Sequence, residues 1–210
     1  MADILFITRQ LEKLKRVQTR MDKADLGVSL ERADYPAAEN QSLSLKDMAL
    51  GRARGAYKRY RKPILVEENG FYIDELQGFP GPFVHYVMST LGLNGILSAL
   101  QNHENRSARF VSVVVFVDQA GEEHVIIDDQ SSKGKISQIP AEKNEQLPSD
   151  LWRIFMPDGY DKPVATMTPS ELSEYMAKRG ELSAMNQMIE HMPTLLEKIK
   201  TMSKDIEMSR

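Results

Sequence analysis

The first 70 residues alternate between short apolar runs and helical patterns. The apolar, partly β-branched run Ile4–Thr8 predicts a buried strand, and Leu11–Met21 carries apolar residues at the spacing of a helix. The segment Ser29–Gln41 is polar and is predicted to be irregular. A second helix is predicted over Leu43–Arg61, followed by a second buried strand over Ile64–Val66. A strand that leads directly into a helix leaves the first helical amides free for an anion.

The middle of the chain combines a rigid turn with a broken helix. Phe71–Ile73 either extends the preceding strand or starts a hairpin. Gly78–Pro82 is predicted to be a rigid turn, because glycine and proline both specialise the backbone. His85–Gln101 is predicted to be helical, with a break at Gly92 or Gly95.

The second half begins with strand patterns. Arg109–Asp118 and Glu123–Asp128 are predicted to pair as a hairpin across a short turn that contains glycine. Gly134–Ile139 is predicted to be a further short strand. This alternation of helices and strands predicts an α/β fold with antiparallel hairpin content in its second half.

The last third is predicted to be mainly helical. Thr168 as N-cap, Pro169 in the first turn and Glu171 three residues after the cap predict a helix start. A further helix is predicted over Glu181–Ile199, interrupted or restarted at Pro193. The final residues, 203–210, are expected to form a flexible tail.

Composition is that of an ordinary soluble globular protein. The 210 residues are 41% hydrophobic and 27% charged, which fits one domain, or two small lobes that share a core. The net charge of −3 gives no basic field for a nucleic-acid polymer. No signal peptide and no apolar run of about 20 residues is found, so no membrane association is expected. The absence of cysteine excludes a thiol nucleophile and suits a cytoplasmic location.

Two polar segments are candidates for binding chemistry. Glu67 and Glu68 end an apolar strand, where carboxylates can hold a hard divalent cation, although alternation lets only one readily face a given side. Thr8, Gln10 and Lys13 surround a predicted helix start and could hold a polyphosphate. The alternatives are a solvated turn with two surface acids, and a capped helix with a surface lysine.

A third basic segment, Lys178–Gly180, could contact a phosphate or a base. Basic residues near a helix C-terminus are also expected from the helix dipole alone. The four histidines show no pair at the i,i+4 spacing of a helical metal site, and the methionines of the last third are interpreted as packing residues.

The order of these motifs resembles the inosine triphosphate (non-canonical purine NTP) pyrophosphatase family over most of the chain. The family motif T-x-N-x-x-K matches Thr8–Lys13, with Gln10 in place of asparagine, and Arg52-Ala53 stands where the family has Lys-Ala. The motif V-E-D-[ST]-G-L matches Val66–Phe71, and G-x-P-G matches Gly78–Gly81, followed by Pro82-Phe83. Later, R-S-A-x-F matches Arg106–Phe110.

The C-terminal third departs from the family pattern. The family's F-G-[YW]-D-P-x-F element matches well only at Phe155, and the Pro-Asp-Gly at 157–159 also matches. Trp152 occupies the Asp position of that element unless a shift brings in Asp150. The family's S-H-R-G is Ala177–Gly180, so lysine replaces histidine. The strand-end aspartate is Glu68, one methylene longer.

The resemblance implies an elongated mixed β-sheet flanked by helices, with two lobes around a central nucleotide cleft in one domain spanning 1–210. It implies a cytoplasmic homodimer that converts a nucleoside triphosphate to the monophosphate and pyrophosphate with Mg²⁺, or Mn²⁺. The implied catalytic residues are Glu68 and Lys13; the metal ligands are Glu67, Glu68 and a third acid, Glu39 or Asp34. Substrate contacts are implied for Thr8, Gln10, Lys13, Arg52, Asn69, Gly70, Phe83, Trp152, Lys178 and Arg179.

Two alternatives to that activity arise from the departures. The first is a nucleotide-binding or regulatory homologue that has lost or weakened catalysis. The second is a pyrophosphatase with a different base preference, because the altered segment is the one that contacts the base in the family.

Overall fold

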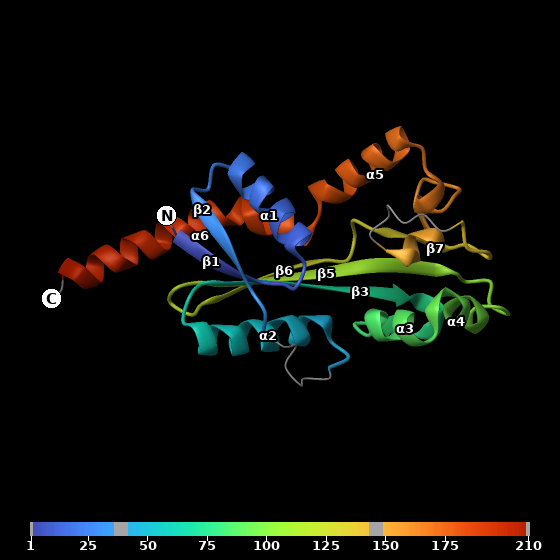
Figure 1. Ribbon diagram of the computed structural model, residues 1–210, viewed down its shortest axis with the longest axis horizontal. Helices are drawn as coiled ribbons and strands as arrows, with labels where there is room; N and C mark the ends of the chain where they lie inside the picture. Colours follow the sequence, from blue (N-terminus) through green and yellow to red (C-terminus); the bar gives the residue numbers. More distant parts are fainter. Residues whose placement is uncertain (1, 36–41, 143–148, 209–210) are drawn as a thin grey trace. The chain divides into compact units, whose positions relative to one another are not determined.

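The computed structural model describes residues 2–35, 42–142 and 149–208 (Figure 1). The chain forms two compact units. Unit 1 consists of Met1–Glu68, Val113–Ile127 and Ser183–Arg210, and unit 2 consists of Asn69–Ser112 and Asp128–Leu182. The strands β3 (Ile64–Ile73) and β5 (Ser107–Val117) each contribute residues to both units. The two apolar runs predicted at 64–66 and 71–73 therefore belong to one continuous strand.

Three parallel strands organise unit 1. Strand β1 (Ala2–Ile7) pairs with β2 (Val28–Ala33), and the register places Ile7 opposite Ala33. On its other side β1 pairs with β3. The sequence prediction of an irregular segment from residue 29 was wrong over 29–33. Strand β2 lies at the end of the strand order β2-β1-β3-β5-β7-β8, and an edge strand can carry polar side chains because only one side is paired.

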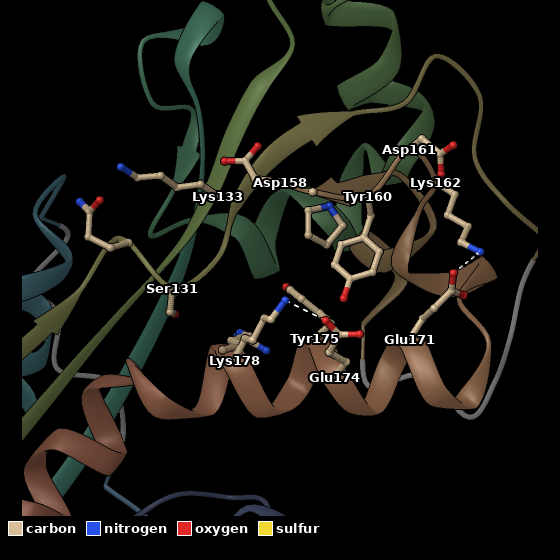
Figure 2. Close-up of a pocket in the computed structure, with 14 residues that line it drawn as sticks. Ser131, Lys133, Asp158, Tyr160, Asp161, Lys162, Glu171, Glu174, Tyr175 and Lys178 are labelled. Carbon is tan, nitrogen blue, oxygen red and sulfur yellow. Dashed lines mark hydrogen bonds and ion pairs between the residues drawn. The ribbon is translucent and has the colours of Figure 1, made fainter.

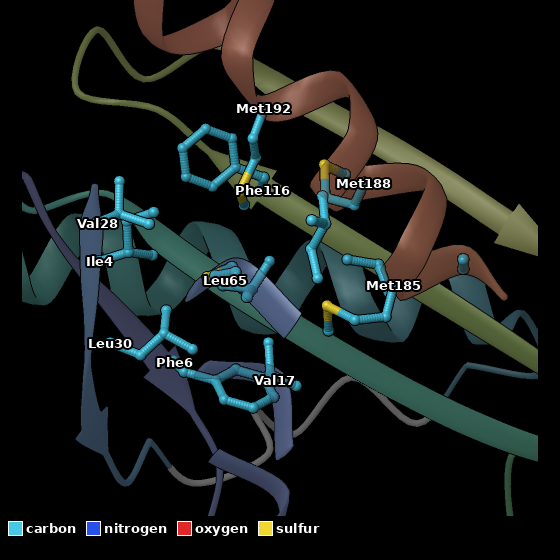
Figure 3. Close-up of a cluster of buried hydrophobic side chains, with 14 residues drawn as sticks. Ile4, Phe6, Val17, Val28, Leu30, Leu65, Phe116, Met185, Met188 and Met192 are labelled. Atoms are coloured by element: carbon cyan, nitrogen blue, oxygen red, sulfur yellow. The ribbon is translucent and has the colours of Figure 1, made fainter. Parts of the chain in front are cut away.

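Helices cover both faces of these strands. Helices α1 (Leu11–Lys23) and α6 (Ala184–Met208) lie on one face, and α2 (Leu45–Tyr60) lies on the other (Figure 1). The core on the α1 side is continuous and includes four methionine or isoleucine side chains of α6 (Figure 3). Its buried members are Ile4, Phe6, Val17, Met21, Val28, Leu30, Leu65, Val114, Phe116, Ala184, Met185, Met188, Ile189 and Met192.

Helix α6 continues through Pro193, so the predicted interruption there was wrong. Met185, Met188, Ile189 and Met192 anchor the preceding turns in the core, while Pro193 itself is exposed. Tertiary burial of one helix face thus outweighs the loss of a backbone hydrogen bond at the proline. The helix also includes residues 203–208 of the segment predicted to be a tail.

Unit 2 is built on antiparallel pairs. Strand β4 (Pro80–Gly81) pairs with β3, and β7 (Lys133–Ile136) lies between β5 and β8 (Phe155–Pro157). In unit 1, strand β6 (Glu123–Asp128), whose last residue alone belongs to unit 2, pairs with β5, as the predicted hairpin requires. The predicted turn at 78–82 contains a cis peptide bond between Phe79 and Pro80.

The helices of unit 2 are α3 (Val84–Thr90), α4 (Gly92–Ala99) and α5 (Pro169–Glu181), with short 3-10 turns at Asp74–Leu76, Asp150–Arg153 and Val164–Thr166. Gly92, with φ of +63°, separates α3 from α4, so one of the two predicted break positions is confirmed. The capping box of α5 is also confirmed. The buried core residues are Phe71, Ile73, Val87, Leu93, Ile96, Leu100, Ala108, Ile136, Leu151, Trp152, Ile154, Phe155, Val164 and Tyr175.

The fold is therefore mixed α/β, as the sequence predicts. Among the described residues, no helix combines the length and apolar character that a membrane span requires.

Candidate active site

Polar residues gather in unit 1 where β1 and β2 end and β3 continues beyond its pairing with β1. The register aligns Ile7 with Ala33 and Phe6 with Leu65, so the residues that come after each pair reach the same edge of the sheet. Thr8 and Asp34 directly follow the first pair, and Glu67 comes two residues after Leu65, level with Thr8. The amide of Thr8 still donates to the Ala33 carbonyl at 3.1 Å, which extends the pairing to the edge. Ligands of α/β sheets bind outside such carboxyl ends.

Lys13 of α1 binds Glu67. Its Nζ lies 3.0 Å from Glu67 Oε2 and donates to the Glu67 backbone carbonyl at 3.2 Å. The two side chains are only 14% and 15% exposed. The ammonium also lies 5.8 Å from the ring centre of Phe6, which is fully buried. Helix α1 therefore holds a cation over the middle of β3. The sequence prediction that Glu67 and Glu68 end a strand was wrong, because β3 continues to Ile73 in a second apolar run.

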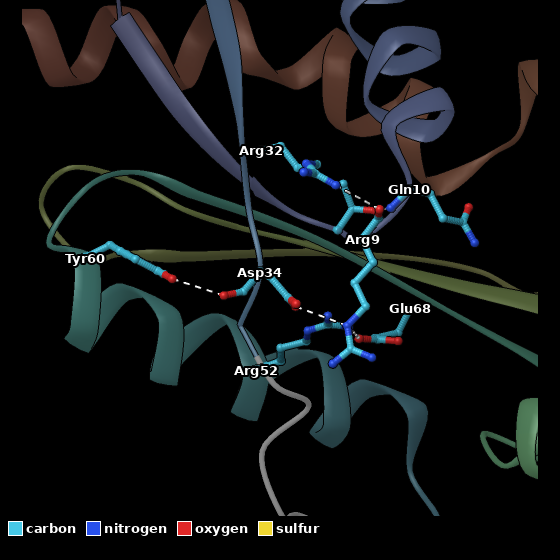
Figure 4. A network of polar contacts seen from close by, with 8 residues as sticks. Arg9, Gln10, Arg32, Asp34, Arg52, Tyr60 and Glu68 are labelled. Atoms are coloured by element: carbon cyan, nitrogen blue, oxygen red, sulfur yellow. Dashed lines mark hydrogen bonds and ion pairs between the residues drawn. The ribbon is translucent and has the colours of Figure 1, made fainter.

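Arg52 of α2 binds Glu68. Its guanidinium donates to Glu68 Oε1 at 2.6 Å, and the side chains are 16% and 21% exposed (Figure 4). Its Nε atom is buried and has no hydrogen-bond partner among the described residues. Each of the two glutamates thus has its own cation, from a different helix.

The two glutamates face different sides of the sheet. Neighbouring residues in a strand point to opposite faces, and Leu65 shares the face of Glu67 in the core beside α1. Glu68 points toward α2, on the other face (Figure 4). The alternation noted in the sequence therefore separates the acids, although both lie at the same edge.

Asp34 is a third acid at this edge. Its carboxylate lies 3.2 Å from Arg9 Nε, in an exposed ion pair, and its backbone carbonyl accepts from the Tyr60 hydroxyl at 3.1 Å (Figure 4). Glu39, the other candidate for a third metal ligand, lies outside the described residues. The backbone carbonyl of Arg9 accepts from Arg32 at 3.1 Å.

The start of α1 lacks a side-chain cap. Thr8 is buried, and its Oγ1 accepts from the Gln10 amide at 3.1 Å. Gln10 occupies the N-cap position, but its side chain makes no capping hydrogen bond. No N-cap side chain therefore caps the first-turn amides of α1, and such amides bind anions readily.

The edge carries only oxygen ligands of the kind that hard divalent cations prefer. Glu67, Glu68 and Asp34 supply three carboxylates, and no sulfur or imidazole group is among them. Each carboxylate is neutralised by a cation in the structure: Lys13, Arg52 or Arg9. The type of donor atom thus fits Mg²⁺, although among the described residues the ligand atoms of these three carboxylates do not all lie within 4.8 Å of one another. The cations match the oxygens of a polyphosphate.

Unit 2 contains a separate pocket of about 940 Å³ beside α5 (Figure 2). Lys178 and Arg179, both predicted substrate contacts, line it. Lys178 Nζ lies 2.8 Å from Glu174 Oε1, a hydrogen bond that raises the lysine pKa. The Arg179 guanidinium lies 5.7 Å from the ring centre of Phe110.

Two tyrosines that the sequence did not single out also line this pocket. Tyr160 and Tyr175 meet edge to face with ring centres 6.2 Å apart. The Tyr175 hydroxyl shares a 2.8 Å hydrogen bond with Ser132, and burial raises the pKa of Tyr175. Tyr160 directly follows the Pro-Asp-Gly match, so that match was the signal that could have identified it.

The remaining predicted contacts differ in accessibility. Trp152 is 6% exposed and packs in the core of unit 2, so its indole is not available to stack on a base in this structure. Phe83 is half-buried at the start of α3. Asn69 is exposed. Gly70 is buried, and a Cβ there would lie 2.7 Å from the Tyr72 ring and 3.0 Å from the Gly81 carbonyl oxygen.

A second acidic group lies in unit 1 on the β5–β6 hairpin. Ligand atoms of Asp118, Glu122 and His124 lie within 4.8 Å of one another. However, Asp118 Oδ1 already accepts from the amides of Ala120 and Glu122 at 2.9 Å, and Oδ2 lies 3.2 Å from His124 Nε2. These contacts close the hairpin turn and explain the cluster without a metal.

The fold and the edge of unit 1 together define an α/β protein with a candidate phosphate- and metal-binding site. Comparison with known families specifies it further. The model of the Ham1 family matches residues 4–191, and the chain belongs to this family.

Relatives and solved structures agree with that assignment. The chain is 34% identical to the dITP/XTP pyrophosphatase of Methanopyrus kandleri over 80% of this chain and 86% of the relative. It is 32% identical to the protein of that name from Ignicoccus hospitalis, over 84% and 88%. A nucleoside-triphosphatase / dITP/XTP pyrophosphatase structure from Mycobacterium abscessus matches with a TM-score of 0.72 and 27% identity, over 86% of this chain and 96% of that one. A HAM1 protein of Coxiella burnetii has the same fold, with a TM-score of 0.75 and 22% identity, over 94% and 100%.

Proposed function

We propose that this protein is a metal-dependent nucleoside-triphosphate pyrophosphatase that acts on a non-canonical or modified purine nucleotide. The observation that carries the proposal is the strand edge of unit 1, where Lys13 pairs with Glu67 and Arg52 pairs with Glu68. Relatives named dITP/XTP pyrophosphatase cover most of the chain, which supports the same activity here. The reaction adds water to a nucleoside triphosphate and gives the monophosphate and pyrophosphate.

The cationic side chains bind the triphosphate in this proposal. Lys13 and Arg52 supply two positive charges, and Thr8 and Gln10 flank the uncapped start of α1. Charge-assisted hydrogen bonds to phosphate oxygens are about twice as strong as neutral ones. Preorganised cations also stabilise the charge that develops as the bond between the α-phosphorus and the bridging oxygen breaks.

Glu67 and Glu68, with Asp34 as third acid, would hold Mg²⁺ or Mn²⁺. When bound, such an ion offsets phosphate charge. Glu68 orients the attacking water and takes its proton as oxygen bonds to the α-phosphorus. The pyrophosphate leaves with the bridging oxygen. The longer side chain of glutamate reaches the same edge of the sheet from β3.

Lys178 and Arg179 are proposed to contact the base or a phosphate. Both line the pocket of unit 2, together with the ring of Tyr160. Asn69, Gly70 and Phe83 remain proposed contacts on the grounds of the motif match. Trp152 is left out of this set because it is buried in the core. A cytoplasmic homodimer is also proposed from the family, and sedimentation velocity tests the dimer.

The test is to compare Glu68→Gln with the wild-type protein on a panel of ribo- and deoxyribonucleoside triphosphates with Mg²⁺ or Mn²⁺. We expect the variant to lose about 10²-fold or more of its pyrophosphate release, because a misplaced catalytic group alone costs about that much. Glu31→Gln is the control: Glu31 is an exposed acid of β2, paired with Lys62, and its loss should leave the rate unchanged. Wild-type turnover by Glu68→Gln contradicts the role of Glu68.

One observation favours a second candidate function. All three acids at the edge are held by cations, and the catalytic acid is a glutamate where the family has aspartate. A protein in this state could bind nucleotides without hydrolysing them. Calorimetric binding of a triphosphate with no pyrophosphate release at any Mg²⁺ or Mn²⁺ concentration supports this alternative.

A further inference from the structure

Each proposed metal ligand on β3 is occupied by a proposed phosphate-binding cation. Glu67 holds Lys13 at 3.0 Å, and Glu68 holds Arg52 at 2.6 Å. All four side chains are mostly buried, at 14% to 21% exposure. By contrast, the Arg54–Glu123 pair on the same helix as Arg52 exposes 60% of its arginine. The two β3 pairs are therefore poorly screened by solvent.

Because these ion pairs are poorly screened, either the metal or the polyphosphate should bind weakly to this edge when the other ligand is absent. A cation that binds Glu67 would leave Lys13 largely desolvated and unpaired, and a cation that binds Glu68 would do the same to Arg52. A polyphosphate that takes Lys13 and Arg52 would leave two carboxylates unpaired beside a polyanion. Breaking a desolvated ion pair by removing one partner is strongly unfavourable. If both ligands arrive together, the four side chains exchange partners and none is left unpaired.

We infer that the Lys13–Glu67 and Arg52–Glu68 pairs couple metal binding to triphosphate binding by exchanging partners. This inference rests on the proposed function, because it uses the same side chains. The coupling is reciprocal: the factor by which bound triphosphate raises the affinity for metal equals the factor by which bound metal raises the affinity for triphosphate. Lys13 and Arg52 lower the affinity for free metal, and Glu67 and Glu68 lower the affinity for metal-free triphosphate.

Partner exchange and a merely structural role predict opposite changes in ligand affinity when one member of a pair is removed. If the pairs only stabilise the fold, removing one partner loosens the edge and weakens the binding of every ligand. If the pairs compete with ligands, removing the cation strengthens metal binding, and removing the acid strengthens triphosphate binding. Equilibrium binding of each ligand by itself therefore separates the two roles without any measurement of turnover.

The first experiment measures Mn²⁺ binding to the full chain without nucleotide, by paramagnetic resonance or calorimetry. Arg52→Met is expected to bind Mn²⁺ at least about fivefold more tightly than the wild type, the lower end of typical coupling factors. Arg54→Met is the matched control, because it removes the same charge from the same helix but from the exposed pair with Glu123. It should leave Mn²⁺ affinity within about twofold, since exposed pairs contribute little.

Unchanged or weaker Mn²⁺ binding by folded Arg52→Met overturns the inference. An equal gain by Arg54→Met also overturns it, because the effect would then come from net charge alone. If Arg52→Met does not fold by circular dichroism, Lys13→Met carries the same test through Glu67.

The reciprocal experiment measures binding of inorganic tripolyphosphate in the presence of EDTA. This probe lacks a base, so base recognition does not enter. Glu68→Gln is expected to bind it at least about fivefold more tightly than the wild type, and Glu31→Gln should match the wild type. Weaker binding by Glu68→Gln contradicts the exchange. If no nucleotide is hydrolysed but both affinities rise as expected, the proposed function fails and the partner exchange stands.

Discussion

Two glycines of unit 2 allow backbone segments to approach more closely than any side chain would permit. A Cβ at Gly70 would meet the ring of Tyr72 and the carbonyl of Gly81, where β4 pairs with β3. A Cβ at Gly134 would lie 2.1 Å from the carbonyl oxygen of Met156 on β8. Backbone atoms such as these carbonyls cannot rotate away as a flexible side chain can.

Gly134→Ala is therefore expected to destabilise the protein. The methyl group forces β7 and β8 apart, and overpacking of this kind costs about 1–3 kcal/mol. Urea denaturation followed by circular dichroism measures the change, with Ser173→Ala in α5 as control, expected within about 0.5 kcal/mol. An unchanged midpoint for Gly134→Ala would show that the strands can move apart freely.

The substrate contacts predicted from the family motif differ in whether they are accessible or buried. Lys178 and Arg179 line a pocket, as their polar character allows, whereas Trp152 belongs to the core. A large aromatic side chain in a motif can serve either purpose, and residue type does not distinguish them. Burial depends on packing from distant elements, here including Val87 and Ile96.

At the scale of single elements, α5 shows how local signals can define a helix. The side chain of Thr168 accepts from the amide of Glu171, and Glu171 accepts from the amide of Thr168 at 2.7 Å. Lys162 adds an ion pair to Glu171 at 2.8 Å. The hydrogen bond from Lys162 and that from the Thr168 amide lower the pKa of Glu171 from 4.5 to about 2. The start of the helix that carries Lys178 and Arg179 is thus held by its own residues.

Glu171→Gln should be less stable than the wild type at neutral pH, and the difference in unfolding free energy should shrink as the solution becomes acidic. Because the pKa of Glu171 is depressed in the folded state, its stabilisation is fully present above about pH 4.5 and is lost as pH falls toward about 2. Thermal unfolding of both proteins from pH 7 to pH 2 measures the difference. Lys162→Met should show the same narrowing, and a gap that stays constant with pH would contradict this assignment.

Elements whose signals lie within a few neighbouring residues were predictable. The capping box of α5, the break at Gly92 and the β5–β6 hairpin all match their sequence patterns. Strand β2 and the continuation of α6 through Pro193 were not predicted. In both cases the deciding interaction is long-range: pairing with β1 for the first and burial in the core of unit 1 for the second.

At the scale of the whole molecule, each unit has a hydrophobic core of its own. The core of unit 1 combines β1, β2 and the methionines of α6, and the core of unit 2 combines β7, β8 and α4. Because no buried residue belongs to both clusters among the described residues, we expect each unit to open separately in local fluctuations.

Two variants test this expectation: Met188→Ala in the core of unit 1 and Ile96→Ala in the core of unit 2. Both side chains are buried, at 0% and 1% exposure, and truncation of such a residue costs about 2–5 kcal/mol. Hydrogen exchange in Met188→Ala should speed up mainly in β1 and β2. In Ile96→Ala it should speed up mainly in β7 and β8. Equal acceleration of both regions by either variant would show that the units unfold as one.

The sequence by itself determined the α/β class, most helix and strand positions, and the residue types of the candidate site. Hydrophobic periodicity and capping depend on residues within one or two turns, and the order of motifs resembles one family. Tertiary structure decided which charges meet. Lys13 and Glu67 are 54 residues apart and Arg52 and Glu68 are 16 apart, and only the parallel register of β1, β2 and β3 brings them to one edge. Pairing of distant charges depends on strand register and helix packing, which no local pattern encodes.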